Sequence, residues 1–348
     1  MTTSQCSTKD CFKLMEVKPS NNRFVSSVPF LVRSVEGKGL GVVAARDIGP
    51  GQLIMSETAL ILAKRETAEC LTVNQARQIF KQAAMLNKVQ KAKLMNLHCL
   101  EDRRVLNIFK NNCIHVDGSN IGLYLLISRI NHSCCPNSIV CKGTVKEVRA
   151  MKYIKKGEEI TITYIVNTSA TKLKREQDLR YWQFECDCEV CSLSGKQLLD
   201  NNKIRDKIVE NDIQVSKFVE NITVVQDNLE IIPEDSRRLL QCDIYVSIIQ
   251  MVRVAENTVD LMYRLKEQML MQLFSAHLHV LLLYYKALGI NIINVEETDR
   301  RVKGHVLKLE MMVGWCKDWR PLLAEAIGRG IMFSMKQCRG DGCGYHDS

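Results

Sequence analysis

Short apolar runs rich in β-branched residues mark the first part of the chain, from residue 23 to residue 62. Three of these runs cover residues 30–35, 39–44 and 53–57. Glycine and proline interrupt the chain between them, as in the segment Ile48-Gly49-Pro50-Gly51. Short runs bounded by such turn residues are typical of β-strands. This part of the chain is therefore predicted to form β-strands joined by tight turns.

Helical spacing replaces this pattern between residues 68 and 110. Apolar residues recur there at near-helical intervals, for example at Ile79, Ala83, Leu86 and Val89. Such spacing places apolar side chains along one face of a helix. We therefore expect a helical insert that interrupts the β-rich part of the chain.

Strand-like runs return at residues 138–140, 145–150 and 160–163. They end well before Gly195, where the composition changes again. The boundary between a β-rich module and a second part of the chain is therefore expected near Gly195.

The chain after residue 197 has the composition of four or five helices and no cluster of strand-like runs. Examples of the expected helices are residues 242–255, 261–288 and 320–336. Paired helices with short connections would fit a tetratricopeptide-like solenoid, although the chain shows no clean self-similarity at that repeat length. The predicted fold class is α+β, with the β-rich module followed by an all-α domain.

The composition is that of an ordinary soluble globular protein, with 46% apolar and 25% charged residues in a chain of 348. No run of about 18 uncharged apolar residues is present, so no membrane-spanning helix is expected. The residues after Met1 lack the apolar core of a secretory signal, which favours a cytoplasmic or nuclear protein.

The formal net charge is +9. An acidic partner such as chromatin would suit this charge, and solvated lysines on helix faces would explain it equally well. The chain has no arginine-rich run and no interleaved aromatic stripe. Direct nucleic-acid binding is therefore not indicated.

Fifteen cysteines are present, and three of them form a C-x-C-x-x-C cluster at Cys186, Cys188 and Cys191. Structural zinc takes four tetrahedral ligands, and sulfur is a preferred donor. The fourth ligand must then come from elsewhere, and Cys134 is the natural candidate, because metal would join the two motifs. Its neighbour Cys135 is expected to point elsewhere. The alternative is three buried thiols, although the acidic residues between them argue against a buried strand.

A second metal site is conceivable at the C-terminal end, where Cys338, Cys343 and His346 lie close together. One cysteine pair and one histidine are a weak ligand set, so an irregular end is the favoured interpretation. One zinc ion is expected. A closed four-thiolate site leaves no open coordination position, so that zinc would hold structure and perform no chemistry.

Three motifs occur in an informative order along the chain. Residues 131–137 read Asn-His-Ser-Cys-Cys-Pro-Asn, residues 157–164 read Gly-Glu-Glu-Ile-Thr-Ile-Thr-Tyr, and the cysteine cluster follows. This order resembles the SET-domain protein lysine methyltransferases. The resemblance implies a β-rich SET fold in which the Asn-His segment threads through a neighbouring loop as a pseudoknot, followed by a zinc-binding post-SET knuckle.

The resemblance, combined with the hydrophobic pattern, predicts six segments. In order they are an irregular lead-in, the N-terminal SET strands, the helical SET insert, the SET core, the post-SET zinc knuckle and the helical C-terminal domain. Their expected ranges are 1–22, 23–67, 68–118, 119–170, 171–194 and 195–348.

A binding site for S-adenosylmethionine is also implied. Asn131 and His132 would contact the adenine and amino-acid ends of this cofactor, whereas an isolated Asn-His pair is more often a satisfied polar pair in a core. The glycine-rich turn at residues 37–41 would approach the cofactor's carboxylate, with Lys38 as ion-pair partner, although such a turn is often only a hairpin. The expected cofactor-binding residues are Lys38, Gly39, Leu40, Asn112 (with Asn111 as the alternative), Asn131, His132, Tyr164 and Phe184.

Tyr164 matches the catalytic tyrosine of the family, although an aromatic residue at a strand end is often structural. Methyl transfer needs the lysine amine aligned with the sulfonium and uncharged. The ordinary pKa of that amine is about 10.4, and a narrow apolar channel lowers it. Phe184 and Trp182 would line this channel, whereas aromatics before a zinc knuckle are otherwise usually packing.

Within the family the chain most resembles the SET-and-MYND subfamily. The supporting segments are Gly122-Leu123-Tyr124, residues 184–188 and the long helical second half. Between residues 62 and 100, however, the only cysteines are Cys70 and Cys99. The MYND zinc finger of that subfamily is therefore expected to be absent, together with any recruitment that depends on it.

The sequence thus predicts an S-adenosylmethionine-dependent protein-lysine N-methyltransferase, with a histone or non-histone protein as substrate and a monomer as the working form. One alternative is a catalytically inactive SET-like scaffold that binds partner proteins through its helical half. A second is a thiol-redox or metal-sensing protein that uses the abundant cysteines.

Overall fold

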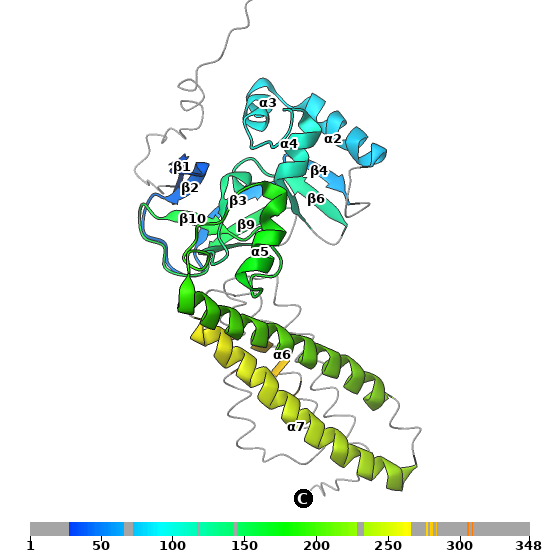
Figure 1. Ribbon diagram of the computed structural model, residues 1–348. Coiled ribbons are helices and arrows are strands. Elements are labelled where there is room, and N and C mark those ends of the chain that lie inside the picture. Colours follow the sequence, from blue (N-terminus) through cyan, green and yellow to red (C-terminus); the bar gives the residue numbers. More distant parts are fainter. Residues whose placement is uncertain are drawn as a thin grey trace, which may run out of the picture. The chain divides into compact units, whose positions relative to one another are not determined.

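The structure is a computed structural model (Figure 1). It describes residues 28–65, 72–116, 119–141, 145–227 and 233–265, and the single residues Ala276, His277, His279, Val280, Leu283, His305 and Lys308. The expected lead-in over residues 1–22, the expected helix over 320–336 and the cysteine-containing C-terminal end lie outside the described residues.

The chain divides into two compact units. The first is formed by Met1–Asn131 and Gly143–Thr161, and the second by His132–Lys142 and Ile162–Ser348. The division therefore separates two consecutive residues of one motif, Asn131 and His132.

A β-hairpin opens the described part of the first unit. β1 (Phe30–Val35) pairs antiparallel with β2 (Gly39–Ala44). In the turn between them, Gly37 and Gly39 have φ angles of 71° and 76°. Side chains disfavour this left-handed region, so the tight turn depends on glycine at both positions. The last four residues of β2 are buried.

Eight further strands complete three small sheets. They are β3 (Leu53–Thr58), β4 (Ile61–Lys64), β5 (Cys113–His115), β6 (Asn120–Leu123), β7 (Asn131–His132), β8 (Ser138–Val140), β9 (Val145–Ala150) and β10 (Glu159–Ile162). The sheet orders are β1-β2-β10-β7, β3-β9-β8 and β4-β6-β5. The strand-like runs predicted before residue 62 and after residue 138 are confirmed.

The end of the predicted helical insert differs from expectation. Residues 113–115 form strand β5, because they pair antiparallel with β6, with Cys113 opposite Leu123 and His115 opposite Ile121. Pairing with β6 gives backbone N–H and C=O groups of these residues hydrogen-bond partners.

Three helices lie in the described part of the insert: α2 (Val73–Met85), α3 (Lys88–Met95) and α4 (Val105–Asn112). Two capping boxes start the first two, Thr72 with Gln75 and Asn87 with Gln90. A new helix begins after the Asn87 cap, so the apolar spacing of α2 does not continue into α3. Val89, which that spacing placed on the inner face, is 48% exposed.

The insert packs on its own hydrophobic core in the first unit. Ile79 of α2 and Phe109 of α4 are fully buried in a cluster that also contains Ile61 of β4 and Leu123 of β6. The apolar spacing predicted for this segment thus buries one face of α2 against the β4-β6-β5 sheet.

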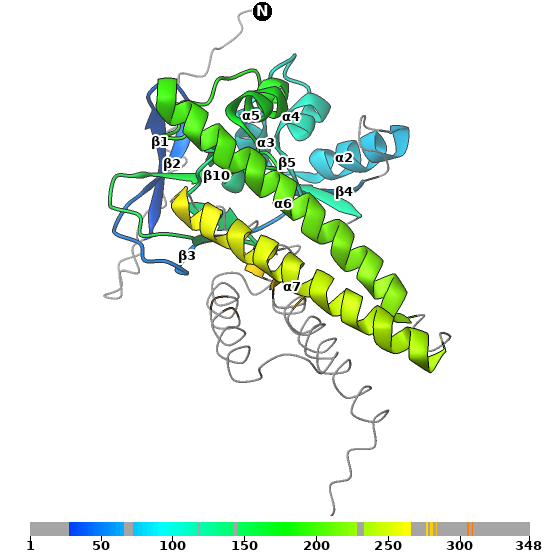
Figure 2. The ribbon, with the colours of Figure 1, turned by 60° about the horizontal axis from the view of Figure 1, so that its bottom comes forward.

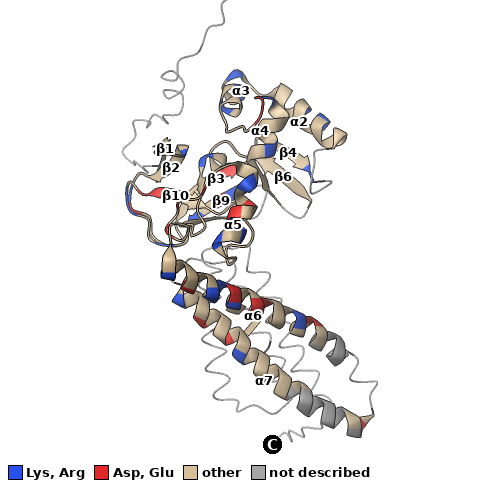
Figure 3. Cartoon of the chain, viewed as in Figure 1, with Lys and Arg blue, Asp and Glu red and all other residues tan. Residues whose placement is uncertain are grey.

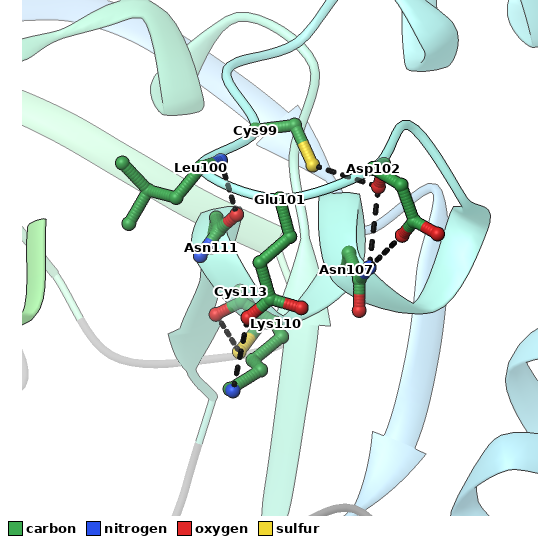
Figure 4. Close-up of polar contacts among 8 residues, drawn as sticks. All are labelled: Cys99, Leu100, Glu101, Asp102, Asn107, Lys110, Asn111 and Cys113. Carbon is green, nitrogen blue, oxygen red and sulfur yellow. Dashed lines mark hydrogen bonds and ion pairs between the residues drawn. The ribbon is translucent and has the colours of Figure 1, made fainter.

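A short loop between α3 and α4 is closed by its own polar contacts (Figure 4). The backbone N–H of Leu100 donates to Asn111 Oδ1 at 3.0 Å. The Cys99 thiol and the Asn107 amide both donate to the carbonyl oxygen of Asp102. Cys99, one of the two cysteines noted between residues 62 and 100, therefore takes part in a loop contact.

Helices dominate the described part of the second unit. α5 (Lys172–Leu179) leads into a single 3₁₀ turn, η2 (Arg180–Trp182). Two long helices, α6 (Gly195–Asp227) and α7 (Glu234–Arg264), then lie side by side (Figures 1 and 2). The start of α6 at Gly195 coincides with the predicted boundary.

The expected break between helices at residues 255 and 261 is wrong. α7 runs through these residues to Arg264. Within it the Thr258 hydroxyl donates to the Val254 carbonyl oxygen at 2.8 Å, and Val259 is buried. α6 and α7 contain 33 and 31 residues, so each is about as long as one complete tetratricopeptide repeat. α6 and α7 therefore do not have the dimensions of tetratricopeptide helices.

Charged residues of both signs are interspersed along α6 and α7 (Figure 3). Mixed charge of this kind suits a solvated helix face better than a nucleic-acid surface. Within the described ranges, no helix combines the length and apolar character needed to cross a membrane.

Candidate functional site

Four cysteine thiols converge in the second unit. The sulfur atoms of Cys134, Cys186, Cys188 and Cys191 all lie within 4.8 Å of one another. Cys134 follows strand β7, and the other three lie in the turns between η2 and α6. The sequence-predicted ligand set is therefore brought together, while the backbone N–H of Cys135 bonds to the Ser133 hydroxyl oxygen.

The spacing of these thiols fits a tetrahedral zinc site. A zinc–sulfur bond of about 2.3 Å implies about 3.8 Å between sulfur atoms at the corners of a tetrahedron. The Cys134 sulfur lies 4.0 Å from that of Cys186 and 3.5 Å from that of Cys191. Hydrogen bonding with Cys134 lowers the pKa of Cys191, whereas hydrogen bonding with Cys186 raises the pKa of Cys134, as expected for thiols that lie close enough to share protons.

Apolar and charged groups surround the thiols. Ile165 and Leu179 are buried beside Cys134 and Cys191, and Trp182 packs against the same cluster. The guanidinium of Arg175, on α5, donates to the Cys191 sulfur at 3.6 Å. The cluster is thus largely screened from water, and a cation lies beside it.

His132 links this cluster to Tyr164. The backbone N–H of Tyr164 donates to His132 Nδ1 at 3.0 Å, so that ring nitrogen is an acceptor and the ring proton belongs on Nε2. His132 Nε2 lies 3.3 Å from the Cys134 sulfur, to which it therefore donates. The histidine is 4% exposed, and both of its ring nitrogens are satisfied.

Four aromatic rings meet at Tyr164. Its ring centroid lies 5.3 Å from that of His132, 5.4 Å from that of Trp182 and 6.4 Å from that of Phe184. Gln183 adopts a φ of 56°, a left-handed conformation that is uncommon for a residue with a side chain and that turns the chain just before Phe184. Phe184 remains 38% exposed, which leaves part of this aromatic group accessible to a ligand.

A second polar group occupies the first unit, at the hairpin. Glu159 of β10 accepts a hydrogen bond from the Asn131 amide at 2.8 Å and pairs with the Lys38 ammonium at 3.2 Å. Gly41 lies beneath them: a β-carbon at this position would be 2.8 Å from Asn131 Nδ2. Two predicted cofactor residues, Asn131 and Lys38, are thus held by one carboxylate.

Glu159 was not identified from the sequence as a site residue. It belongs to the Gly-Glu-Glu-Ile motif, in which Glu158 precedes strand β10 and Glu159 is the first residue of that strand. Gly39 and Leu40 continue from the turn into β2, with Leu40 half-buried.

Asn112 lies at the end of α4, where it is buried. Its amide nitrogen donates to the carbonyl oxygens of His98 and Ile108, both at 2.7 Å. Both amide hydrogens are therefore used inside the insert, and a contact with a cofactor would have to use Oδ1. The alternative, Asn111, accepts the backbone N–H of Leu100.

Glu57 is a positioning residue that the sequence did not reveal. Its carboxylate, on β3, accepts the backbone N–H groups of Leu125, Leu126 and Ile127 at 2.7 to 3.1 Å. These residues lead through a 3₁₀ turn, η1 (Ile127–Arg129), directly to Asn131. Burial raises the pKa of Glu57. No clear signal in the sequence marks it, because Glu57 lies between Ser56 and Thr58 at the polar end of β3.

The profile of the SET domain family matches residues 39–165. The histone-lysine N-methyltransferase set5 of Schizosaccharomyces pombe is 29% identical over 184 residues, which are 51% of this chain and 55% of set5. The N-lysine methyltransferase SMYD2 of Gallus gallus is 29% identical over 165 residues, or 47% of this chain and 34% of SMYD2. The histone-lysine N-methyltransferase SMYD3 of Homo sapiens is 43% identical over 77 residues, or 22% of this chain and 18% of SMYD3.

The chain therefore spans about half the length of set5 and about a third of the length of chicken SMYD2. The matched residues begin at strand β2 and include the Asn-His motif and Tyr164, whereas strand β1 precedes the matched segment and the three clustered cysteines of the knuckle follow it.

Proposed function

Because residues 39–165 form a SET domain, we propose that this chain is an S-adenosylmethionine-dependent protein-lysine N-methyltransferase. The observation that carries the proposal is the aromatic group of His132, Trp182 and Phe184 around Tyr164. The names of the relatives support the reaction class. The substrate is a lysine of a histone or non-histone protein, and the enzyme acts as a monomer in the nucleus or cytoplasm.

The donor groups of the chain suit this cofactor. The Lys38 ammonium offers a partner for a carboxylate, and aromatic faces such as that of Phe184 attract a sulfonium cation. When bound, the cofactor supplies a methyl group activated by positive charge on sulfur. The residues assigned to its binding are Lys38, Gly39, Leu40, Asn112 (through Oδ1), Asn131, His132, Tyr164 and Phe184.

Tyr164 is assigned as the catalytic residue. The target amine must be neutral to attack carbon, and the aromatic walls of Trp182 and Phe184 exclude water and so lower its pKa from about 10.4. The Tyr164 hydroxyl orients the amine toward the methyl group. His132 fixes the backbone of Tyr164 through its Nδ1, which keeps this hydroxyl in one position.

The thiol cluster is assigned one structural zinc ion. Cys134, Cys186, Cys188 and Cys191 would fill all four tetrahedral positions, so zinc would take no part in the reaction. Its role is to fasten the segment of Cys134 to the knuckle that carries Phe184. Zinc content of the purified protein tests this assignment separately from activity.

Transfer of a radiolabelled methyl group to proteins of a lysate tests the function. Tyr164→Phe should lower labelling by about a hundredfold or more, because one oriented hydroxyl is lost from the transition state. Tyr153→Phe is the matched control, since its hydroxyl bonds to Asp47 on an exposed surface. Labelling should be unchanged in that variant.

Undiminished labelling by Tyr164→Phe would overturn the catalytic assignment. A wild-type protein that neither labels protein nor binds S-adenosylmethionine by calorimetry would favour the alternative, an inactive scaffold that acts through its helical half. Rapid loss of zinc under mild oxidation would favour a metal-sensing or redox role.

A further inference from the structure

Arg175 lies in an unusual place for a charged side chain. It is 1% exposed, on α5. One guanidinium nitrogen donates to the Ala170 carbonyl oxygen at 2.6 Å, and the other donates to the Cys191 sulfur at 3.6 Å. Its Nε finds no hydrogen-bond partner among the described residues. In the described ranges no carboxylate forms an ion pair with it.

A buried cation without a counter-charge costs several kcal/mol, so the position needs an electrostatic explanation. Four thiolates around one Zn²⁺ carry a net charge of about two negative units. The Cys191 sulfur is one of those thiolates in the proposed zinc site. A guanidinium in contact with it is therefore next to the compensating charge that its burial requires.

We propose that Arg175 is an outer-sphere partner of the zinc centre: it donates to the Cys191 thiolate and offsets the negative charge of the four-thiolate cluster. This inference rests on the proposed zinc site. Groups of this kind hold the ligands in place and reduce the reactivity of the coordinated sulfur. The guanidinium also donates to Ala170, in the segment that follows Tyr164, so it connects the zinc centre to that segment.

A second buried arginine, Arg205, donates to oxygen atoms, as a residue with a structural role does. Arg205 of α6 is 0% exposed, and it donates to the Thr168 carbonyl oxygen at 2.5 Å and to that of Ala170 at 3.4 Å. Its Nε donates to Asn201 Oδ1. Arg205 thus supports the same segment through oxygen atoms, and it serves as the matched control.

The test compares the zinc-loaded full chain with Arg175→Gln, Arg175→Lys and Arg205→Gln. The first readout is the rate of zinc release to a chelator, and the second is the rate at which iodoacetamide alkylates the knuckle cysteines, followed by mass spectrometry. Removing an outer-sphere partner typically weakens metal binding by about 10- to 100-fold, so Arg175→Gln should speed both rates at least tenfold.

Arg175→Lys should lie between the wild type and Arg175→Gln, because an ammonium keeps the charge but loses the planar fork. Arg205→Gln should lower the melting temperature and leave both rates at the wild-type value. If Arg175→Gln does not fold, Arg175→Lys decides: release several-fold faster than wild type supports the inference.

Wild-type release and alkylation rates in folded Arg175 variants would overturn it, as would equal acceleration in Arg205→Gln. A wild-type protein without stoichiometric zinc would overturn both the zinc site and this inference. That result would leave the methyl-transfer proposal standing, since labelling and calorimetry with S-adenosylmethionine test it independently.

Discussion

Replacing Gly41 with alanine would place a methyl group where three side chains converge. A β-carbon built on Gly41 lies 2.6 Å from Val35 Cγ2, 2.8 Å from Asn131 Nδ2 and 3.0 Å from Glu159 Oε1. Carbon atoms in favourable contact are about 3.5 to 4.0 Å apart. At least one of these side chains must therefore move by about 1 Å.

The cost can be bounded from the structure. Overpacking a well-filled site typically destabilises a protein by about 1 to 3 kcal/mol, and loss of Gly entropy in the unfolded chain returns about 0.4 to 1 kcal/mol. Val35 is branched and lies in the paired β1 strand, so the Asn131 amide is the more easily displaced. Its displacement breaks the bond to Glu159 and misplaces a proposed cofactor contact. A shift of about 1.4 kcal/mol corresponds to a tenfold loss of affinity for S-adenosylmethionine.

Calorimetric titration with S-adenosylmethionine and urea unfolding measure the two effects. Gly41→Ala should weaken cofactor binding about 10-fold or more and lower the free energy of unfolding by about 1 to 2 kcal/mol. Gly49→Ala is the control: its β-carbon would meet only Gln52, at 3.7 to 4.0 Å, so both quantities should stay unchanged. A folded Gly41→Ala protein with wild-type affinity would refute the role given to Asn131.

Three further outcomes are expected. Cys188→Ser should release the zinc and lower the melting temperature by several degrees, because only three of the four tetrahedral ligands remain. Retention of the metal, measured by atomic absorption, would contradict the proposed site. Glu57→Ala should lower the free energy of unfolding by about 1 to 2 kcal/mol, because the partly buried backbone N–H groups of Leu125 and Ile127 lose their acceptor. Glu57→Gln keeps one carbonyl oxygen, so its free energy of unfolding, measured by urea titration, should fall less. Burial lowers the pKa of His277 to about 3. The unfolded chain then binds more protons, so stability should fall as pH drops below about 6.5, by about 2 kcal/mol at pH 5, and thermal melts of His277→Gln should show a weaker pH dependence.

The four cysteines of the thiol cluster could be predicted from the sequence, whereas the buried arginine beside them could not. Cys186, Cys188 and Cys191 lie within one short turn region, so their spacing alone indicated a metal-binding knuckle. Cys134 came from the requirement for a fourth ligand, and the structure brings its sulfur within 4.8 Å of the others. Arg175 was not foreseen, because a basic residue in a polar helix reads as solvated until its burial is known.

The helical insert shows the opposite case. Its apolar spacing predicted helices, yet the cap at Asn87 and the pairing of β5 with β6 divided it differently. A cap can be read from Asn87 and Gln90, since both partners are local. The conversion of residues 113–115 into a strand depends on a neighbour that lies in a different segment of the chain.

Features whose interacting residues lie within a few positions of each other follow from the local sequence. These are the glycine turn at residues 37–41, the capping boxes and the cysteine knuckle, where local backbone preferences and ligand spacing are sufficient. Three other features depend on the folded chain: Glu159 bonds to Asn131 and Lys38, Tyr164 donates to Nδ1 of His132, and Arg175 is buried beside Cys191. Each of these depends on packing between distant segments, which sets burial and hydrogen-bond geometry and which no local pattern encodes.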